Sequence, residues 1–404
     1  MELWWHCLDM KEKTVDLRRE FHRIPEYGRT LPKTRAVVCR ELERMGISYT
    51  LNPYDDGLFA TIQGQPGGPC IAFRADMDAL QVQEQTGLPY ASEHQGYMHA
   101  CGHDAHVAML LSAAEVLQSH RKSFYGRVRL MFESGEETGT GSDDMIAAGG
   151  LQGVDAVLGL HIGNITGPEV PSGTFVVKPG ACTAAKDRIT LVVRGKGCHG
   201  AQPNEGVDPI LIAARIVLSL QNLHDELPPG TPAVLTFGSF HSGEGHNVIP
   251  ETAVLKGSLR TQDKKIRDYI VQRVEEIAVH TAQAFRGTCE VVIQQGSSVV
   301  NNDAKLAARV AKALRFFAGA DRVLENLPGA MMGSDDFALY MKNIPGVYYF
   351  LSTADVQLGT DVPHHNERFD IDERQLWVGA ASIVSIVEEL CTQEQAIIWS
   401  KQHE

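Results

Sequence analysis

The stretch YMHACGHDAHVAM, residues 97–109, concentrates side chains that bind transition metals. Within eight positions it carries His99, Cys101, His103, Asp104 and His106. Thiolate, imidazole and carboxylate groups are the usual protein ligands of zinc and related ions. A closed structural zinc site needs four ligands, usually in two tight pairs, and only Cys101 and His103 form such a pair here. We therefore expect the remaining ligands to come from distant parts of the chain, as in a catalytic site assembled by the fold.

A second group of reactive side chains is the adjacent pair Glu136 and Glu137, which follows the predicted strand RVRLMFES, 127–134. Neighbouring carboxylates on an irregular turn can take different tasks, since one can bind a metal while the other moves a proton. The simpler alternative is two exposed acids in a loop, because the following ETGTGSDDM contains the Gly and Ser of a loop. Taken alone, the pair would favour that simpler alternative.

Other candidates also lie at the ends of predicted strands. Asp76 follows CIAFRA, His161 ends the run AVLGLH, and His364 and His365 lie in the turn-rich DVPHHNERFDIDE. Ligands of an open α/β sheet gather beyond the carboxyl ends of its strands, so we expect these groups to share one rim. At most one of the two adjacent histidines is expected to bind a metal directly. His106 shares a helix face with His103 and is either a supporting residue or, slightly favoured, a core imidazole.

The elements that position these groups alternate between strand and helix. Strands are predicted at 58–64, 70–76, 127–134, 155–162 and 347–353, with a strong helix at 105–120 and another from about 373. This alternation predicts an α/β fold with a mostly parallel sheet and helices on both faces. Between its two parts, the order βαββαβ predicts an inserted ferredoxin-like α+β domain. We expect a catalytic domain whose first part is 1–185 and whose second part is 298–404. The residues between them, 186–297, are expected to form an inserted lid or dimerisation domain.

Composition sets the broad class of the protein. A chain of 404 residues exceeds the usual size of one hydrophobic core, which agrees with two domains. The formal net charge of −13 argues against nucleic acid or an anionic membrane as a partner. The eight cysteines include no CxxC pair, so a disulfide framework is not expected. With no apolar run that could span a bilayer and no basic, apolar leader at the N-terminus, the expected location is the cytoplasm.

Eight ordered sequence blocks carry a resemblance to a known family. They are RADMDAL (74–80), MHACGHDAH (98–106), SGEETGTGSDDMIAAGGL (134–151), LGLHI (158–162), GKGCHGAQPNEGVDP (195–209), HNVIPETAVLKGSLRT (246–261), GSDDF (333–337) and HHNERFDIDE (364–373). The chain resembles the M20 metallopeptidase family in its amidohydrolase branch. That branch includes aminoacylase-like enzymes, hippurate hydrolases and plant auxin-conjugate hydrolases. The resemblance runs from LRREFHRIPEYG, 17–28, almost to the C-terminus.

The resemblance implies a metal-dependent hydrolase that cleaves the amide bond of small N-acyl-L-amino acids. It implies two divalent metal ions per subunit, which could be Zn, Mn, Co or Ni. Glu136 would act as general base and acid, and Asp76 would orient or tune a ligand. His365 is preferred to His364 because the family ligand directly precedes a short Asn or Ser turn. The implied metal ligands are Cys101, His103, Glu137, His161 and His365.

The inserted domain would contribute to the substrate site and to assembly. The resemblance implies that it supplies His199 and Asn247 to the substrate, across the interface of a homodimer or higher oligomer. Arg260 is a candidate for the substrate carboxylate because arginine suits bidentate recognition, although an ordinary surface or salt-bridged arginine is about equally expected. Departures from the family pattern at Gln81, Cys198 and Asp335 leave the acyl and amino-acid preference open.

Two alternatives remain at this stage. A metal-dependent dipeptidase or exopeptidase would share the metal site and differ in its acyl pocket. A non-catalytic binding protein of the same fold would have lost a ligand or the general base, whereas all six residues are present in this chain.

Overall fold

The computed structural model describes residues 2–164, 167, 169–327 and 329–395 of the chain. Internal contacts divide the chain into two compact units. Unit 1 comprises Met1–Cys182, Val300–Met331 and Asp335–Glu404, and unit 2 comprises Thr183–Val299 and Met332–Ser334. The expected domain bounds of 1–185 and 298–404 for the two parts of the catalytic domain, and of 186–297 for the inserted domain, stay a prediction.

Unit 1 is built on an eight-stranded sheet in the order β1-β2-β4-β3-β5-β16-β6-β15. Its central strands β4, β3, β5 and β16 are parallel, which confirms the predicted parallel sheet. The outer strands β1 and β2 and the contact of β6 with β16 are antiparallel, so the sheet is mixed. The strands are β1 (Tyr49–Leu51), β2 (Leu58–Gln63), β3 (Gln65–Asp76), β4 (Tyr125–Glu133), β5 (Ala156–Gly163), β6 (Phe175–Val176), β15 (Val323–Leu324) and β16 (Gly346–Ser352), with a separate pair β7 (Gly180–Ala181) and β14 (Asn301–Asn302).

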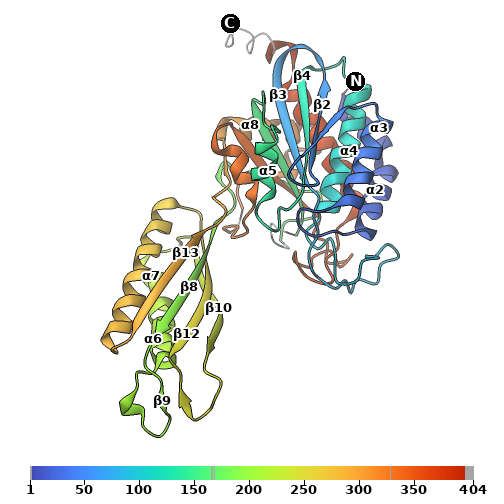
Figure 1. Ribbon diagram of the computed structural model, residues 1–404. Coiled ribbons are helices and arrows are strands. Elements are labelled where there is room, and N and C mark those ends of the chain that lie inside the picture. Colours follow the sequence, from blue (N-terminus) through green and yellow to red (C-terminus); the bar gives the residue numbers. More distant parts are fainter. Residues whose placement is uncertain (1, 165–166, 168, 328, 396–404) are drawn as a thin grey trace. The chain divides into compact units, whose positions relative to one another are not determined.

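Both faces of this sheet are covered by other elements. Because successive side chains of a strand point to opposite faces, each buried strand contributes to two cores. In β3, Ile71 and Phe73 pack into the core with the long helices, whereas Cys70 and Ala72 pack into a second core on the other face. The helices of unit 1 are α1 (His6–Asp9), α2 (Lys11–Arg23), α3 (Pro32–Arg44), α4 (His103–Ser119), α5 (Gly141–Ala147), α8 (Ala304–Ala318) and α9 (Leu376–Leu390), with short 3-10 helices η1 (Leu3–Trp5), η4 (Ala320–Arg322), η5 (Asp336–Lys342) and η6 (Glu373–Gln375). Figure 1 shows α2, α3 and α4 side by side against the sheet.

Unit 2 has the predicted βαββαβ order around its own core. Its antiparallel sheet has the order β10-β12-β8-β13, and α6 and α7 bury Ile212 and Val274 against it. A small two-stranded sheet, β9 with β11, is separate from the main one. The elements are β8 (Ala185–Arg194), β9 (Cys198–His199), η2 (Pro203–Glu205), α6 (Pro209–Gln221), η3 (Asn222–Glu226), β10 (Ala233–Ser242), β11 (Val248–Ile249), β12 (Thr252–Thr261), α7 (Lys264–Ala284) and β13 (Thr288–Gln295).

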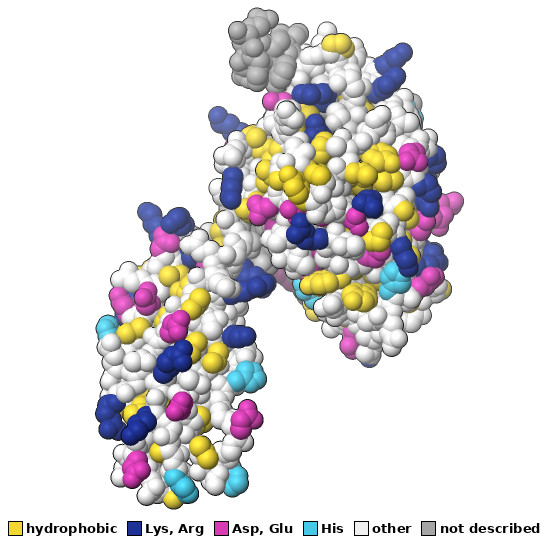
Figure 2. Space-filling model, in the orientation of Figure 1, with side chains coloured by type: hydrophobic (Ala, Val, Ile, Leu, Met, Phe, Trp, Pro, Cys, Tyr) yellow, Lys and Arg dark blue, Asp and Glu magenta, His cyan; other side chains and the backbone are white. Residues whose placement is uncertain are grey.

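The surface agrees with the acidic, mixed-charge composition. Charged side chains of both signs are spread over the face seen in Figure 2. Within the described ranges, no helix combines the length and apolarity that a membrane span requires.

Candidate metal centre

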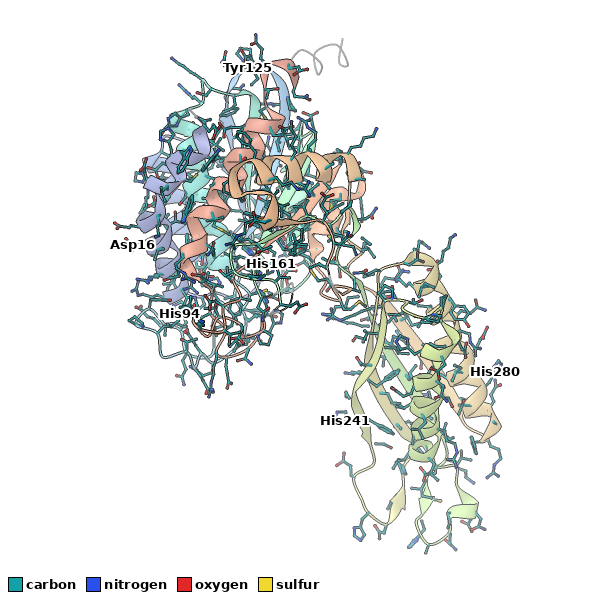
Figure 3. All side chains as sticks on the ribbon, turned by 180° about the vertical axis from the view of Figure 1, so that it is seen from behind. Asp16, His94, Tyr125, His161, His241 and His280 are labelled. Carbon is teal, nitrogen blue, oxygen red and sulfur yellow. The ribbon has the colours of Figure 1, made fainter. Side chains whose placement is uncertain are left out.

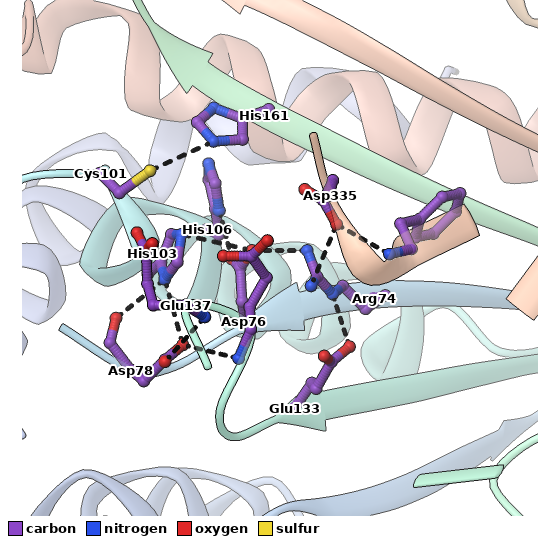
Figure 4. Close-up of polar contacts among 12 residues, drawn as sticks. Arg74, Asp76, Asp78, Cys101, His103, His106, Glu133, Glu137, His161 and Asp335 are labelled. Carbon is purple, nitrogen blue, oxygen red and sulfur yellow. Dashed lines mark hydrogen bonds and ion pairs between the residues drawn. The ribbon is translucent and has the colours of Figure 1, made fainter. Parts of the chain in front are cut away.

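The carboxyl ends of neighbouring strands meet at one rim of the unit 1 sheet. Asp76, the last residue of β3, lies opposite Glu133, the last residue of β4, and His161 lies near the end of β5. The turn after β4 carries Glu136 and Glu137. Figure 4 shows Asp76, Glu137 and His161 close to Cys101 and His103, where α4 begins.

The five expected ligands form one continuous cluster of donor atoms. Donor atoms of Cys101, His103 and His161 all lie within 4.8 Å of one another, and so do those of Cys101, Glu137 and His365. A third group, within the same distance, joins His103 to Glu136 and Glu137. Because these groups share members, the structure brings all five residues together beside Glu136.

The short step from Cys101 to His103 depends on the glycine between them. Gly102 has a φ of 87°, a left-handed conformation that glycine adopts without steric cost. A Cβ atom at this position would lie 3.1 Å from Ile162 Cγ2. Gly102 therefore allows the chain to turn sharply into α4 while the side chains on both sides of it remain in the cluster.

The histidines are oriented as metal ligands usually are, with one ring nitrogen held by the backbone. His103 Nδ1 donates to the carbonyl oxygen of Asp78 at 2.8 Å, and His161 Nδ1 donates to that of Ile162 at 3.0 Å. His103 Nε2 is buried and lies 3.4 Å from Asp76 Oδ2, and His161 Nε2 lies 3.6 Å from Cys101 Sγ. Two directed imidazole nitrogens beside a thiol and a carboxylate fit a divalent transition metal.

The two adjacent histidines at 364 and 365 occupy different environments. His365 has a φ of 65°, its N–H donates to Ala100 O at 2.8 Å, and its Nε2 lies 3.3 Å from Glu137 Oε1. Hydrogen bonds with Cys101 and Glu137 raise the pKa of His365 to about 10. His364 instead donates from Nε2 to Ile162 O at 3.0 Å, and its ring packs 4.7 Å from that of Phe369. Of the two, the structure therefore brings His365 into the cluster.

Asp76 lies just behind the cluster and is fixed on two sides. Its Oδ1 lies 2.5 Å from His106 Nδ1, and its Oδ2 accepts from Arg74 Nη1 at 2.5 Å. His106 Nε2 accepts the backbone N–H of Ile162 at 2.9 Å, so both ring nitrogens of His106 are used. His106 is thus neither a metal ligand nor a simple core imidazole, because it holds Asp76 in place. Burial opposes ionisation of Asp76, but the Arg74 charge holds its pKa well below the usual range.

Glu136 sits in an acidic environment that suits proton exchange. One of its oxygens lies within 4.8 Å of carboxylate oxygens of Asp335 and Asp336. Burial, followed by the charges of Asp335 and Glu137, raises the pKa of Glu136 well above its ordinary value. A carboxyl group with a raised pKa can both accept and return a proton near neutral pH.

Two residues support this site in roles that the sequence did not reveal: Asp78, a candidate only by its place after the strand CIAFRA, and Arg74, which sequence reasoning missed. Asp78 is fully buried and accepts the backbone N–H groups of Glu136 at 3.2 Å and Glu137 at 3.1 Å, which fixes the acidic turn. Arg74, also buried, donates to Glu133 at 2.7 Å and to Asp336 at 3.0 Å. The signal was available, because Arg74, Asp76 and Asp78 alternate with apolar residues and so share a face.

In unit 2 the structure brings together His199 and Asn247 but not Arg260. His199 pairs with Val248, and the N–H of Gly200 donates to Asn247 O at 2.8 Å. The N–H of Ala201 donates to His199 Nδ1 at 3.0 Å, so the proton of the exposed His199 ring is on Nε2. Figure 1 shows β9 beyond one end of the sheet of unit 2.

Arg260 lies near the opposite end of β12. It is eight residues beyond Thr252, which corresponds to about 26 Å of extended strand. Its Nη1 donates to Met332 O at 2.7 Å, and no carboxylate of the described ranges lies within ion-pair distance of it. Burial lowers the pKa of this guanidinium. Arg260 is therefore a partly buried cation without a described acidic partner.

Several histidines of the described ranges lie outside this cluster. Figure 3 shows His161 within unit 1, whereas His241 and His280 lie on unit 2. Both of those residues are exposed, whereas His94 is half-buried. Burial and directed hydrogen bonds distinguish the clustered histidines from the surface ones.

Comparisons with known proteins agree on one family and one chemistry. The family described as Peptidase family M20/M25/M40 matches residues 72–389. The chain is 37% identical to N-acetyl-L-cysteine deacetylase of Bacillus subtilis, covering 90% of this chain and 85% of that protein. It is 33% identical to IAA-amino acid hydrolase ILR1-like 5 of Arabidopsis thaliana, covering 94% and 86%. The crystal structure of the Bacillus subtilis YXEP protein, described as a dinuclear metal binding peptidase from the M20 family, matches with a TM-score of 0.81 at 30% identity, covering 97% and 99%.

Proposed function

Because the chain belongs to peptidase family M20/M25/M40, we propose that the cluster beside Glu136 is its active site and that it hydrolyses small N-acyl-L-amino acids. The enzyme is a metal-dependent amide hydrolase. The observation that carries the assignment is the convergence of five donors around one carboxyl group, which is oriented by Asp78 and has a raised pKa.

The donor set fits two divalent ions per subunit. Cys101, His103, Glu137, His161 and His365 would hold them, with Cys101 and His103 each belonging to more than one donor group. When bound, such ions polarise the amide carbonyl and lower the pKa of water toward neutrality. A soft thiolate favours zinc or cobalt, and manganese or nickel would also be accepted.

The side chains of the protein would then move the protons. Glu136 takes the proton of the attacking water and returns it to the departing nitrogen. Asp78 keeps the Glu136–Glu137 turn in place through two backbone hydrogen bonds. Asp76, clamped by Arg74 and His106, sets the electrostatic environment of His103, whose Nε2 lies 3.4 Å from Asp76 Oδ2.

Unit 2 would recognise the substrate through two separate regions. His199 would stabilise the developing oxyanion with its Nε2 proton and Asn247 would bind the substrate beside it, whereas Arg260 would bind the substrate carboxylate. The separation of Arg260 from His199 within one unit 2 supports a homodimer in which each site takes these residues from different chains. Mixing the His199→Ala and Arg260→Ala proteins under exchange conditions, at a substrate concentration too low for either variant to turn over alone, should then restore about a quarter of wild-type activity. Absence of restoration in verified mixed dimers would refute the shared site.

Substrate class is tested by measuring amine release. Hippurate and N-acetyl amino acids should be hydrolysed in preference to dipeptides, with activity lost in chelator and recovered with Zn²⁺, Mn²⁺, Co²⁺ or Ni²⁺. Preference for dipeptides would instead establish the exopeptidase alternative. The YXEP structure, which is described as that of a peptidase, is the reason to include dipeptides in the assay. The proposal also places the enzyme in the cytoplasm, where a thiolate ligand stays reduced.

A further inference from the structure

The N-terminal motif LRREFHRIPEYG, residues 17–28, contributes no metal ligand, yet part of it lies deep in unit 1. Arg18 and His22, one turn apart on α2, are both completely buried. Burying an arginine carries a large desolvation cost unless every donor finds a charged partner. The groups that bind the Arg18 guanidinium therefore indicate the role of this buried side chain.

Each nitrogen of the Arg18 guanidinium binds a different carboxylate. Nε donates to Asp104 Oδ2 at 2.8 Å, Nη2 to Asp370 Oδ1 at 3.2 Å, and Nη1 to Glu373 Oε1 at 3.1 Å. Asp104 is itself fully buried, and its Oδ2 also lies 2.7 Å from His22 Nδ1. Only a guanidinium can satisfy three carboxylates in one plane, because lysine offers a single ammonium point.

These carboxylates belong to two segments that lie far apart in the sequence and that each carry expected metal ligands. Asp104 directly follows His103 at the beginning of α4, and Asp370 and Glu373 follow His365 in the segment leading into α9. The His365 segment is joined to the Cys101 segment by one described backbone hydrogen bond, from His365 N to Ala100 O. Arg18 supplies a second, charged connection between the same two segments.

We propose that Arg18 is a positioning residue of the metal centre, which sets the spacing between the Cys101–His103 segment and the His365 segment. This inference rests on the proposed function, since it concerns how those ligands come to share ions. Outer residues that orient metal ligands typically change metal affinity by about 10- to 100-fold when they are removed.

The test is a Co²⁺ titration of the metal-free full-length protein. Binding is monitored by the visible absorption of cobalt bound to the Cys101 thiolate. Arg18→Met should weaken Co²⁺ binding by about 10- to 100-fold, with kcat falling at limiting metal and recovering in excess metal. KM should change less than about threefold, because the substrate residues are untouched. Circular dichroism and the thermal midpoint report whether each variant is folded.

Arg19→Met is the matched control. Arg19 is partly exposed and binds Glu373 through Nε and Nη2, without a described bond to Asp104. It should leave Co²⁺ affinity within about twofold of wild type. If Arg18→Met does not fold, the variants Arg18→Lys and Asp370→Asn test the inference in its place. Each of them should weaken Co²⁺ binding.

A folded Arg18 variant with a lowered thermal midpoint but unchanged Co²⁺ affinity would overturn the inference and leave Arg18 a purely structural residue. Failure of the wild-type protein to bind Co²⁺ would instead refute the proposed function, so the two failures are distinguishable.

Discussion

Removing His364 and removing His365 should have opposite effects on stability and on metal binding. His365 faces Cys101 and Glu137 and is more than half exposed, whereas His364 donates to Ile162 O and packs on Phe369. We expect His365→Ala and His365→Gly to lose metal, and His364→Ala to keep metal but lose stability.

The magnitudes follow from backbone conformation and packing. The φ of 65° at His365 lies in the left-handed region, which costs an L-residue such as alanine about 1–2 kcal/mol that glycine avoids. The greater freedom of glycine in the unfolded chain offsets about 0.5–1 kcal/mol of this gain. The metal-free His365→Gly protein should therefore be more stable than His365→Ala by about 1 kcal/mol. Loss of the packed His364 ring and its hydrogen bond should cost about 2–4 kcal/mol.

Urea unfolding of the metal-free proteins measures the stability difference, and elemental analysis after dialysis against limiting metal measures the ions retained. Wild type and His364→Ala should retain two ions per chain, and both His365 variants should retain fewer. Full metal content in His365→Ala together with loss in His364→Ala would refute the ligand assignment. A His365→Gly protein less stable than His365→Ala would refute the left-handed backbone at this position.

Further predictions concern the proton carrier, the substrate residues and pH. Glu136→Gln should retain both ions and lose activity by about 10²–10⁴-fold in kcat, and ordinary turnover would contradict its role as the base. His199→Ala should lower kcat by about 10²–10³-fold without changing metal content, which kinetics and elemental analysis would show. Arg260→Ala should raise KM for an N-acetyl amino acid but not for the corresponding amide; equal effects on both would exclude a carboxylate contact. Burial raises the pKa of Asp55 to about 6, so its contribution to stability falls as pH rises from about 4 to 6. Asp55→Asn should then stabilise the protein by about 1–2 kcal/mol at pH 8, after allowance for its partial exposure, and by nearly nothing at pH 4; a stabilisation that is independent of pH would contradict this.

The sequence allowed the fold to be predicted where local pattern and topology agree. The alternation of strands and helices predicts the parallel centre of the unit 1 sheet, and the βαββαβ order predicts unit 2. The antiparallel strand β2 was not predicted as such, because strand direction depends on pairing with β4 rather than on the composition of LFATIQ.

Site prediction shows the same division between local and tertiary information. The step Cys101–Gly102–His103 is a local signal, and its geometry depends on one left-handed glycine. The sequence left His106 open between a supporting residue and a core imidazole, because the choice depends on contacts with Asp76 and the N–H of Ile162, which only the folded chain brings together. The partners of Arg18 likewise lie up to 355 positions away along the chain.

The most direct test of the central claim is a crystal structure of the metal-loaded protein with anomalous scattering data. We expect two ion peaks in unit 1, coordinated by Cys101, His103, Glu137, His161 and His365, with Glu136 beside them but outside the ligand set. A single peak, or ions held by other side chains, would contradict this claim.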